Sequence, residues 1–245
     1  MAPFAVILPA AGKSSRFKDR HYRKPFAPLD HRAVWLHSAE RFLNRDDVKQ
    51  LILVVAPQDR QEFDAKFAAN VAVLGIDVVE GGQHRPDSVQ RALDQVRPEI
   101  EYIAVHDAAR PCVASEWIDK VFDAAVESGA AILALPVRGT LKRVAGGKIV
   151  ETVARGDLWE AQTPQVFRRQ LLMDAYAARG DFIATDDAQL VEQLGHPVTI
   201  VQGSPINLKI TTKEDLHLAA HALKAMPKPK NLGSLHPFAD DDLWR

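Results

Sequence analysis

The hydrophobic residues of this chain fall into short, nearly continuous runs, separated by longer segments with apolar residues at helical spacing. The runs are mostly Val, Ile, Leu and Ala, which is typical of strands buried on both faces of a sheet. Strands are predicted at residues 4–8, 51–56, 77–79, 102–105, 131–136 and 198–201. Helices are predicted at residues 33–44, 58–69, 86–96, 115–128, 169–178, 186–194 and 213–224. This alternation predicts an α/β fold with a mostly parallel central sheet.

The ends of the predicted elements divide the chain further. Asp186 and Thr212 stand where the N-caps of two helices belong. The composition changes after residue 225, where three prolines and three consecutive aspartates follow. We therefore expect one domain over residues 1–225 and an extended or partly ordered tail over residues 226–245.

One region departs from the alternation. Within residues 137–159, two β-prone segments flank Gly146-Gly147, a signal for a two-residue hairpin. An isolated hairpin is only marginally stable in water, so packing on a second subunit would stabilise it. The segment is therefore a candidate dimerisation arm. A hairpin that lies on its own domain is the alternative.

Composition narrows the classes of function. The chain has 245 residues, of which 47% are hydrophobic, enough for a sizeable core. The formal net charge of −1 creates no global field that favours nucleic acid or a membrane surface, so any basic site is local. The single cysteine, Cys112, excludes an intramolecular disulfide framework, and we expect it to be a small buried hydrophobe. Without a membrane-length apolar run or a signal peptide, we expect a cytoplasmic protein without nucleic-acid or membrane partners.

Small residues and cations follow the first predicted strand. They are Ala10, Ala11 and Gly12, and then Arg16 and Lys24. A small-residue loop lets backbone N–H groups approach a phosphate chain, and the cations neutralise its charge. The loop is not a P-loop, because Ile7 stands where the first glycine is required, and no G-x-G-x-x-G is present. We interpret it as a nucleotide-binding turn, with an ordinary strand-to-loop junction as the alternative.

A glycine and several polar residues also follow three later strands. They are Gly82, Arg85 and Ser88, then Asp107 and Arg110, and finally Lys209. The glycine segment fits close approach of a ligand, or else a simple turn with an N-cap. Asp107 suits a magnesium ligand facing a phosphate, or else a structural pair with Arg110. One carboxylate among several cations is the composition of a site for a nucleoside triphosphate and Mg²⁺, so phosphoryl-type transfer is favoured over hydrolysis by a triad.

Taken together, these motifs resemble the 2-C-methyl-D-erythritol 4-phosphate cytidylyltransferase family of non-mevalonate isoprenoid synthesis. The matching segments run in family order over about residues 4–224. They are Leu8-Pro9-Ala10-Ala11-Gly12 with Arg16; Gly81-Gly82 with Arg85 and Asp87-Ser88-Val89; Val105-His106-Asp107-Ala108-Ala109-Arg110-Pro111; Pro136-Val137-Arg138-Gly139-Thr140-Leu141-Lys142; Leu158-Trp159 with Gln162-Thr163-Pro164-Gln165; Thr185-Asp186-Asp187; and Asn207-Leu208-Lys209-Ile210-Thr211.

The resemblance implies a Rossmann-like, three-layer α/β/α fold, a homodimer formed through the β-hairpin arm, and a role for each matching residue. Arg16, Lys24 and Lys209 would stabilise the transition state; Ala10, Ala11, Gly12, Gly82, Arg85 and Ser88 would hold CTP; and Asp107 and Arg110 would face Mg²⁺ and the sugar phosphate. Thr140 and Arg155, on the arm, would reach the partner subunit's site, and Thr163 and Thr185 would line the polyol phosphate pocket.

Four positions depart from the family pattern. Pro25 and Phe26 follow Lys24 where the family usually has Gln and Tyr, Gly139 stands where an aspartate is usual, and Ile206 where an acidic residue is frequent. The first departure bears on the assignment of Lys24, and those at Gly139 and Ile206 bear on the detail of the substrate pocket more than on the reaction class.

The expected reaction is therefore the Mg²⁺-dependent transfer of CMP from CTP to 2-C-methyl-D-erythritol 4-phosphate, with release of pyrophosphate. One alternative keeps the chemistry with another nucleotide or polyol phosphate, such as ribitol 5-phosphate. A second alternative is a nucleotide-binding regulator without turnover. The retained Arg16, Lys24, Asp107 and Lys209 argue against that second alternative.

Overall fold

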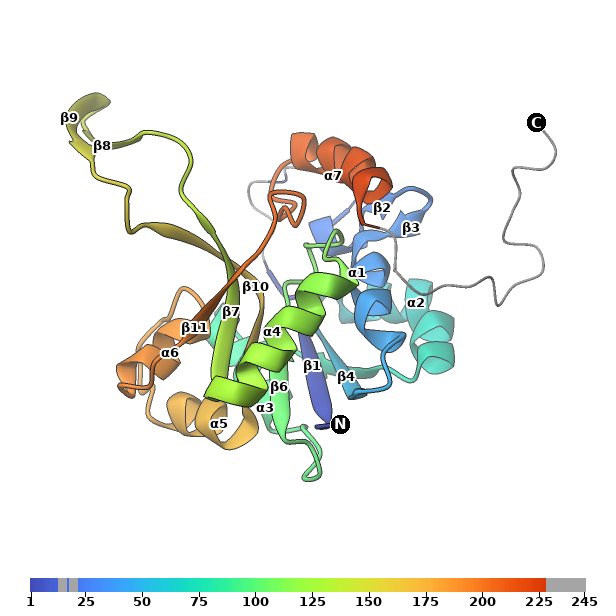
Figure 1. The fold of residues 1–245 in the computed structure, drawn as a ribbon. Helices are drawn as coiled ribbons and strands as arrows, with labels where there is room; N and C mark the ends of the chain where they lie inside the picture. The colour runs from blue at the N-terminus through green and yellow to red at the C-terminus, as the bar shows by residue number, and fades with distance from the viewer. Residues whose placement is uncertain (13–16, 18–21, 228–245) are drawn as a thin grey trace.

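A seven-stranded sheet forms the centre of the molecule, in the order β11-β7-β10-β6-β1-β4-β5 (Figure 1). The structure is a computed structural model that describes residues 1–12, 17 and 22–227. All strands of this sheet run parallel except β10, which is antiparallel to both of its neighbours. The predicted α/β fold with a mostly parallel sheet is therefore confirmed.

The elements lie close to their predicted positions. The strands of the large sheet are β1 (Phe4–Pro9), β4 (Val48–Val55), β5 (Asp77–Glu80), β6 (Tyr102–Val105), β7 (Ala130–Pro136), β10 (Trp159–Arg168) and β11 (Thr199–Gln202). The helices are α1 (Val34–Leu43), α2 (Arg60–Leu74), α3 (Arg85–Leu93), α4 (Ser115–Ser128), α5 (Arg169–Ala177), α6 (Ala188–Gln193) and α7 (Lys213–Ala225). Short elements complete the chain: the 3-10 helices η1 (Lys24–Phe26) and η2 (Pro57–Asp59), and the strand pair β2 (Pro28–Leu29) and β3 (Arg32–Ala33).

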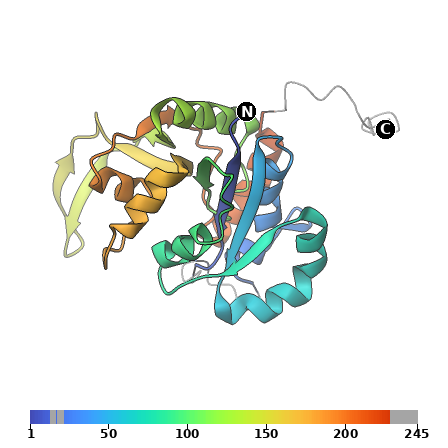
Figure 2. The same cartoon turned by 90° about the horizontal axis from the view of Figure 1, so that it is seen from below.

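Alternating side chains of the central strand β1 contribute to two separate cores. Phe4, Val6 and Leu8 pack in the core that holds α1 and α4, whereas Ala5 and Ile7 pack in the core that holds α3, α5 and α6. This alternation is the period-two geometry of a strand covered on both faces. Figure 2 shows the yellow-green α4 on one side of the sheet and the blue-green α3 on the other. The three-layer arrangement expected from the resemblance is thus present.

Strand β10 was not among the predicted strands. Its sequence carries Gln162, Thr163 and Gln165, and all three are buried. Polar side chains are tolerated inside a domain only where hydrogen bonds satisfy them. Here they are satisfied: the amide of Asn207 donates to Oε1 of Gln162, and the amide of Gln165 donates to Asp186. The hydrophobic pattern that identifies the other strands is therefore missing from β10.

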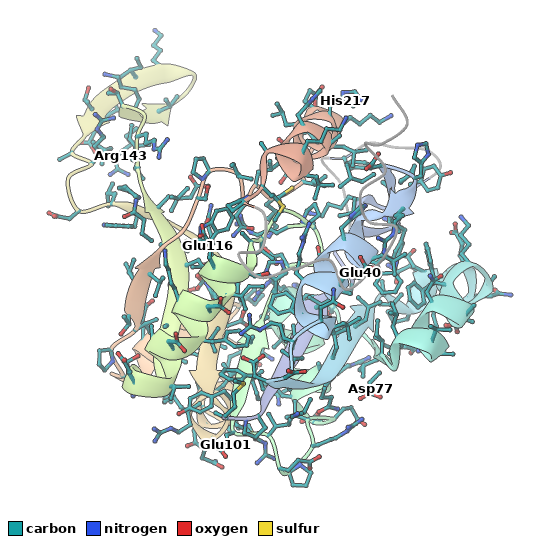
Figure 3. The ribbon with its side chains drawn as sticks, turned by 45° about the vertical axis from the view of Figure 1, so that its right-hand side comes forward. Glu40, Asp77, Glu101, Glu116, Arg143 and His217 are labelled. Carbon is teal, nitrogen blue, oxygen red and sulfur yellow. The ribbon has the colours of Figure 1, made fainter. Side chains whose placement is uncertain are left out.

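The predicted hairpin is confirmed. Strands β8 (Leu141–Ala145) and β9 (Lys148–Val153) pair antiparallel in a sheet of their own, and Gly146 and Gly147 turn between them with φ of 54° and 77°. This arm projects from the body, and Figure 3 shows Arg143 on it well apart from Glu101 and Glu116. Val144, Ile149 and Val150 are exposed on the arm, so the hairpin does not lie on its own domain.

Of the two predicted N-cap residues, Thr212 is confirmed and Asp186 is wrong by one residue. Thr212 caps α7 as expected, because its hydroxyl accepts a hydrogen bond from the backbone N–H of Asp215 at 3.3 Å. Helix α6 begins at Ala188, so Asp187 rather than Asp186 holds the N-cap position. The carboxylate of Asp186 still accepts the backbone N–H of Gln189 at 3.1 Å.

Cys112 lies in a third core cluster with Ala109, Ile210 and residues of α7. Burial raises the pKa of its thiol to about 12, as expected for an inert apolar side chain. No helix in the described part of the chain is long and apolar enough to cross a membrane. The tail assigned to residues 226–245 lies outside the described residues beyond residue 227.

Candidate active site

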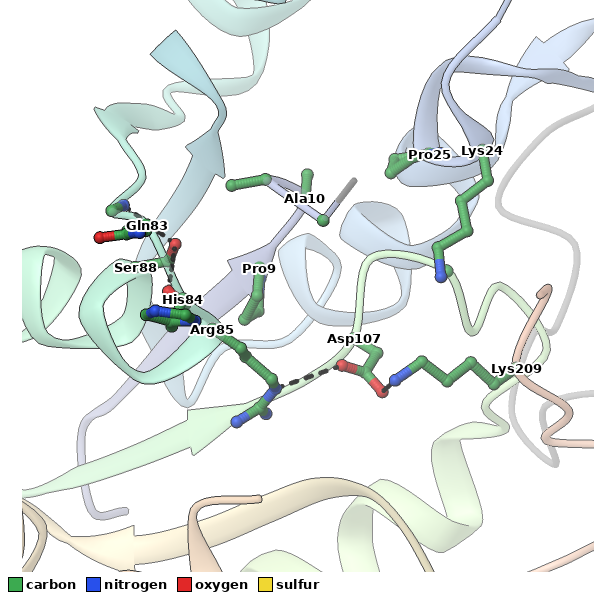
Figure 4. Close-up of a pocket in the computed structure, with 14 residues that line it drawn as sticks. Pro9, Ala10, Lys24, Pro25, Gln83, His84, Arg85, Ser88, Asp107 and Lys209 are labelled. Carbon is green, nitrogen blue, oxygen red and sulfur yellow. Dashed lines mark hydrogen bonds and ion pairs between the residues drawn. The ribbon is translucent and has the colours of Figure 1, made fainter. Parts of the chain in front are cut away.

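A cavity of about 330 Å³ opens at the carboxyl ends of the parallel strands (Figure 4). It lies where β1 has β4 on one side and β6 on the other, although β6 comes after β4 and β5 in the chain. Ligands of open α/β sheets bind at such a switch point, because the loops that follow neighbouring strands diverge there. The cavity is lined by Pro9, Ala10, Ala11, Gly12, Lys24, Pro25, Gly82, Gln83, His84, Arg85, Ser88, Asp107, Ala109 and Lys209.

The small-residue loop after β1 forms one wall of this cavity. The backbone N–H of Ala10 donates to the carbonyl of Val54 at 2.8 Å, which fixes the loop against β4. A Cβ placed on Gly12 would meet no atom within 4 Å, so this glycine faces open space. Ala10, Ala11 and Gly12 are thus where the sequence placed them, whereas Arg16 lies outside the described residues.

The glycine segment forms the next wall, and packing requires both glycines. A Cβ on Gly81 would lie 2.5 Å from the Cβ of Ala11, and a Cβ on Gly82 would lie 2.4 Å from that of Asp87. The hydroxyl of Ser88 accepts the backbone N–H of Gly82 at 3.1 Å and donates to the carbonyl of His84 at 3.2 Å. Ser88 therefore shapes the loop that lines the cavity, and the loop approaches β1 too closely for any side chain.

Asp107 lies at the centre of a cluster of charged side chains. Its carboxylate lies 2.7 Å from Nζ of Lys209, 3.6 Å from Nε of Arg110 and 3.9 Å from Nε of Arg85. Burial would raise the pKa of this carboxyl, but the three cations outweigh burial and hold the pKa well below its usual range. Arg85 also pairs with the buried Asp187, so the three cations face two carboxylates, and the remaining positive charge favours an anionic ligand. Asp107 thus pairs with Arg110 and also lines the cavity, and its role as a magnesium ligand stays a prediction.

Neighbouring buried groups fix the backbone of Asp107. Its N–H donates to Oγ1 of Thr163 at 3.0 Å, and that hydroxyl lies 3.1 Å from Nδ1 of His106. Nε2 of His106 lies 3.0 Å from the carbonyl of Arg110, which can only accept, so Nε2 carries the proton and Nδ1 accepts from Thr163. Burial lowers the pKa of His106 to about 4, so its ring is neutral at pH 7. The hydroxyl of Thr163 is therefore used within the protein.

A second cavity of about 230 Å³ adjoins the first. Arg85, Asp107 and Lys209 line both, so the two cavities meet at the charged cluster. The other residues of the second cavity are Arg110, Ala161, Gln162, Thr163, Gln165, Thr185 and Asp186. Two cavities that share one cluster of charges can hold two substrates with their reacting groups side by side.

The donors at this cluster suit Mg²⁺ only together with a substrate. Within the described residues no group of three or more His, Cys, Asp or Glu side chains could hold a metal ion. Mg²⁺ commonly uses one or two carboxylates, waters and substrate phosphates, so the single carboxylate of Asp107 fits that pattern.

Comparison with known proteins decides the family. The model of the 2-C-methyl-D-erythritol 4-phosphate cytidylyltransferase family matches residues 4–225. The chain belongs to this family. A family member from Rhodopirellula baltica is 44% identical over 229 residues, which cover 89% of this chain and 93% of the relative. One from Bacillus pumilus is 39% identical over 91% of this chain and 97% of the relative. The crystal structure of the Thermus thermophilus member has a TM-score of 0.74 at 32% identity, covering 91% of this chain and all of that one.

Most residues matched by the family resemblance come together in the fold. Lys24 and Lys209 extend into the first cavity from different walls, and Figure 4 shows Lys24 pointing towards the side that holds Asp107 and Lys209. Thr163 and Thr185 line the second cavity. The backbone N–H of Thr185 donates to Oε1 of Gln189, with which its hydroxyl is also in contact.

Two matched residues lie elsewhere. Thr140 and Arg155 are exposed at the base of the arm and line neither cavity of their own chain. The structure of one chain thus does not bring them to the charged cluster.

Several residues at the site were not singled out from the sequence. His106, Gln165 and Asp187 are buried polar residues that connect the cavity walls. Each lies inside a quoted family motif, but the residues alone could not show which neighbour a buried side chain would contact. Tyr176, on α5, lay in no motif and was missed altogether.

Proposed function

We propose that this chain transfers CMP from CTP to 2-C-methyl-D-erythritol 4-phosphate and releases pyrophosphate. The observation that carries the proposal is the cluster of Lys209, Arg110 and Arg85 around Asp107, at the junction of two cavities. Cytidylyl transfer needs a nucleotide and a phosphorylated acceptor side by side, with positive charge where they meet. Membership of the family supplies the identity of both substrates.

CTP occupies the first cavity in this proposal. The loop formed by Ala10, Ala11 and Gly12 and the glycine loop near Gly82 and Ser88 approach the nucleotide through their backbones. Lys24 and Lys209 face the triphosphate, and Arg16 follows the same loop in sequence.

The acceptor occupies the second cavity, where Arg110 binds its phosphate. An acceptor phosphate oxygen attacks the α-phosphorus of CTP in line, the new O–P bond forms, and the bond to pyrophosphate breaks with its electron pair leaving on pyrophosphate. No covalent enzyme intermediate is needed, so positioning and charge neutralisation by Lys24 and Lys209 supply the rate.

The proposal includes Mg²⁺, with Asp107 as its protein ligand beside the phosphates. When bound, the ion would neutralise phosphate charge during transfer. Lys209 and Arg110 hold one carboxylate oxygen of Asp107, whereas among the described residues the other oxygen has only the longer contact with Arg85 at 3.9 Å. That second oxygen is the one available to a metal.

A homodimer completes the proposal. The arm exposes Val144, Ile149 and Val150, a surface that a second copy would bury. Thr140 and Arg155 of one chain would then reach the acceptor in the other chain. Because CTP is a cytoplasmic metabolite, the proposal places the enzyme in the cytoplasm.

A pyrophosphate-release assay tests the proposed reaction. The purified chain is incubated with Mg²⁺ and either CTP or UTP, and with either 2-C-methyl-D-erythritol 4-phosphate or ribitol 5-phosphate. We expect release only when CTP and the methylerythritol phosphate are both present. Preference for ribitol 5-phosphate would support the alternative acceptor, and an absence of release with every pair, while CTP binds, would support a regulator.

A further inference from the structure

Asp187 is a fully buried carboxylate beside the site, at 0% exposure. Its Oδ2 accepts from Nη2 of Arg85 at 2.6 Å, and its Oδ1 accepts from the hydroxyl of Tyr176 at 2.5 Å. Neither of the two cavities is lined by Asp187 or by Tyr176. The carboxylate of Asp187 therefore contacts the site through Arg85, whereas its backbone contacts Gln165, which lines the second cavity.

The backbone of Asp187 is fixed as firmly as its side chain. The N–H groups of Asp187 and Ala188 both donate to Oε1 of Gln165 at 3.0 Å. The amide of Gln165 in turn donates to Asp186 at 2.8 Å. Strand β10 thus holds the start of α6, and Asp187 presents its carboxylate to Arg85 from a rigid position.

Arg85 stands between two carboxylates at unequal distances. Nη2 lies 2.6 Å from Asp187, whereas Nε lies 3.9 Å from Asp107. Burial disfavours the charge on Arg85, but the two carboxylates outweigh burial and raise its pKa, so the guanidinium stays charged. A guanidinium without Asp187 would have Asp107 as its nearest carboxylate partner and would move towards it.

We propose that Asp187 and Tyr176 form a positioning pair that holds Arg85 away from Asp107. Arg85 then faces the substrate phosphates in both cavities, and one oxygen of Asp107 stays open. Tyr176 sets the orientation of the Asp187 carboxylate by satisfying its second oxygen. This inference rests on the proposed cytidylyl transfer, and it names Asp187 as a positioning residue whose carboxylate acts on that reaction through Arg85.

A double-mutant cycle between Asp187 and Arg85 tests the inference. The variants are Asp187→Asn, Arg85→Gln and the double variant, with kcat, KM for CTP and the Mg²⁺ concentration for half-maximal rate as readouts. Loss of a hydrogen bond between charged groups typically lowers an equilibrium or rate constant that depends on it by about 10- to 100-fold. We expect Asp187→Asn to lower kcat/KM by roughly that factor and to raise the Mg²⁺ requirement, because Arg85 then competes for Asp107.

The double variant decides between positioning and mere structural support. If Asp187 acts through Arg85, adding Asp187→Asn to Arg85→Gln lowers kcat/KM by less than about threefold further. Two losses that multiply, or an unchanged Mg²⁺ requirement in Asp187→Asn, would overturn the inference.

Controls and a second route keep the test decisive. Asp174→Asn, an exposed carboxylate on α5, and Tyr102→Phe, whose hydroxyl contacts Val126 at 3.4 Å, are matched substitutions away from the cavities. If Asp187→Asn does not fold, Tyr176→Phe replaces it in the same cycle, with an expected loss of about three- to tenfold and the same non-additivity.

The two proposals can fail separately. The same double-mutant cycle can be measured without turnover, by calorimetric titration of each variant with CTP in the absence of an acceptor. Wild-type protein that binds CTP without forming product, yet shows the non-additive cycle, would contradict the proposed reaction alone. Wild-type protein that turns over with an additive cycle would contradict the positioning role alone.

Discussion

His106 lies fully buried against the ring of Phe42, and its two ring nitrogens connect strand β10 with the loop after β6. A charged ring could no longer accept a hydrogen bond from Thr163, so the network requires neutral His106. The conformation of the Asp107 loop therefore depends on a histidine that touches neither cavity.

The buried histidine makes stability depend on pH. The pKa of His106 is about 4 in the folded chain against an ordinary value of 6.5, so the unfolded chain binds more protons in this range. The contribution of neutral His106 to the free energy of unfolding is complete above about pH 6.5 and is lost as the pH falls towards 4. Between about pH 7.5 and pH 5 the free energy of unfolding should fall by about 2 kcal/mol through this group.

Denaturant titrations of wild type and of His106→Asn at both pH values measure this contribution. The variant should be less stable at pH 7.5 and should lose about 2 kcal/mol less than wild type on acidification. His221→Gln, on the exposed side of α7, is the matched control and should follow wild type. A variant with the full wild-type pH dependence would show that His106 is not the titrating group.

Asp107 offers the second prediction at the scale of single residues. Asp107→Asn removes the carboxylate charge that faces Lys209, Arg110 and Arg85, whereas Asp187 still pairs with Arg85. We expect most activity to be lost, by about 100-fold or more, while CTP still binds in the absence of Mg²⁺. Kinetics over a range of Mg²⁺ concentrations, with a thermal melt to verify folding, provide the measurement. Turnover that stays unchanged at limiting Mg²⁺ would remove Asp107 from the site.

Among the elements, the loops after β1 and β5 depend on each other through close packing. Gly81 contacts the loop of β1 at Ala11, and Gly82 contacts the first turn of α3 at Asp87. Asp87 is itself held by Arg179, whose Nη2 lies 2.8 Å from its carboxylate. The cavity wall is therefore a single packed unit made from three segments of the chain.

Gly82→Ala tests that packing. The added Cβ would lie 2.4 Å from the Cβ of Asp87, so the loop must move and CTP affinity should fall at least about tenfold. Gly156→Ala is the matched control, since its Cβ meets no atom within 4 Å and the residue lies outside the cavity. Calorimetric titration with CTP compares the two. Equal CTP affinities in both variants would contradict the role given to the glycine loop.

The sequence predicts elements well where burial is apolar and poorly where it is polar. The predicted bounds of helix α4 match the structure to the residue, because its apolar face ends at Gly129, which takes a left-handed conformation with φ of 85°. Helix α2 runs on to Leu74 rather than ending at residue 69, and stops where Gly75 takes φ of 63°. The sequence pattern does not predict strand β10, because its buried side chains include amides and a threonine whose hydrogen-bond partners lie far along the chain.

The same distinction holds for the site at the scale of the whole molecule. Residues that follow apolar strands, such as Asp107 and Gly82, could be placed from the strand pattern, since carboxyl ends meet at one edge. The contacts of Asp187 with Arg85 and Tyr176 could not be placed in this way, because only the tertiary fold brings these residues together.

The arm gives a prediction for the assembled molecule. If Arg155 acts in the partner's site, each active site uses Lys24 from one chain and Arg155 from the other. The Arg155→Ala and Lys24→Ala variants then lack residues that come from different chains. A mixed dimer then contains one site with both defects and one with neither. Mixing two inactive variants should restore up to about half of the activity of a wild-type dimer. No rescue after verified subunit exchange, or a monomer by light scattering, would contradict the shared site.

Transfer of CMP through attack on the α-phosphorus is the central claim, and oxygen labelling tests it most directly. Methylerythritol phosphate labelled with ¹⁸O in its phosphate is incubated with CTP, Mg²⁺ and the purified chain, and the products are observed by ³¹P NMR. We expect a cytidine diphosphate product with ¹⁸O in the bridge between its phosphorus atoms, and unlabelled pyrophosphate. Label in the pyrophosphate, or CTP consumed without a bridged product, would contradict it.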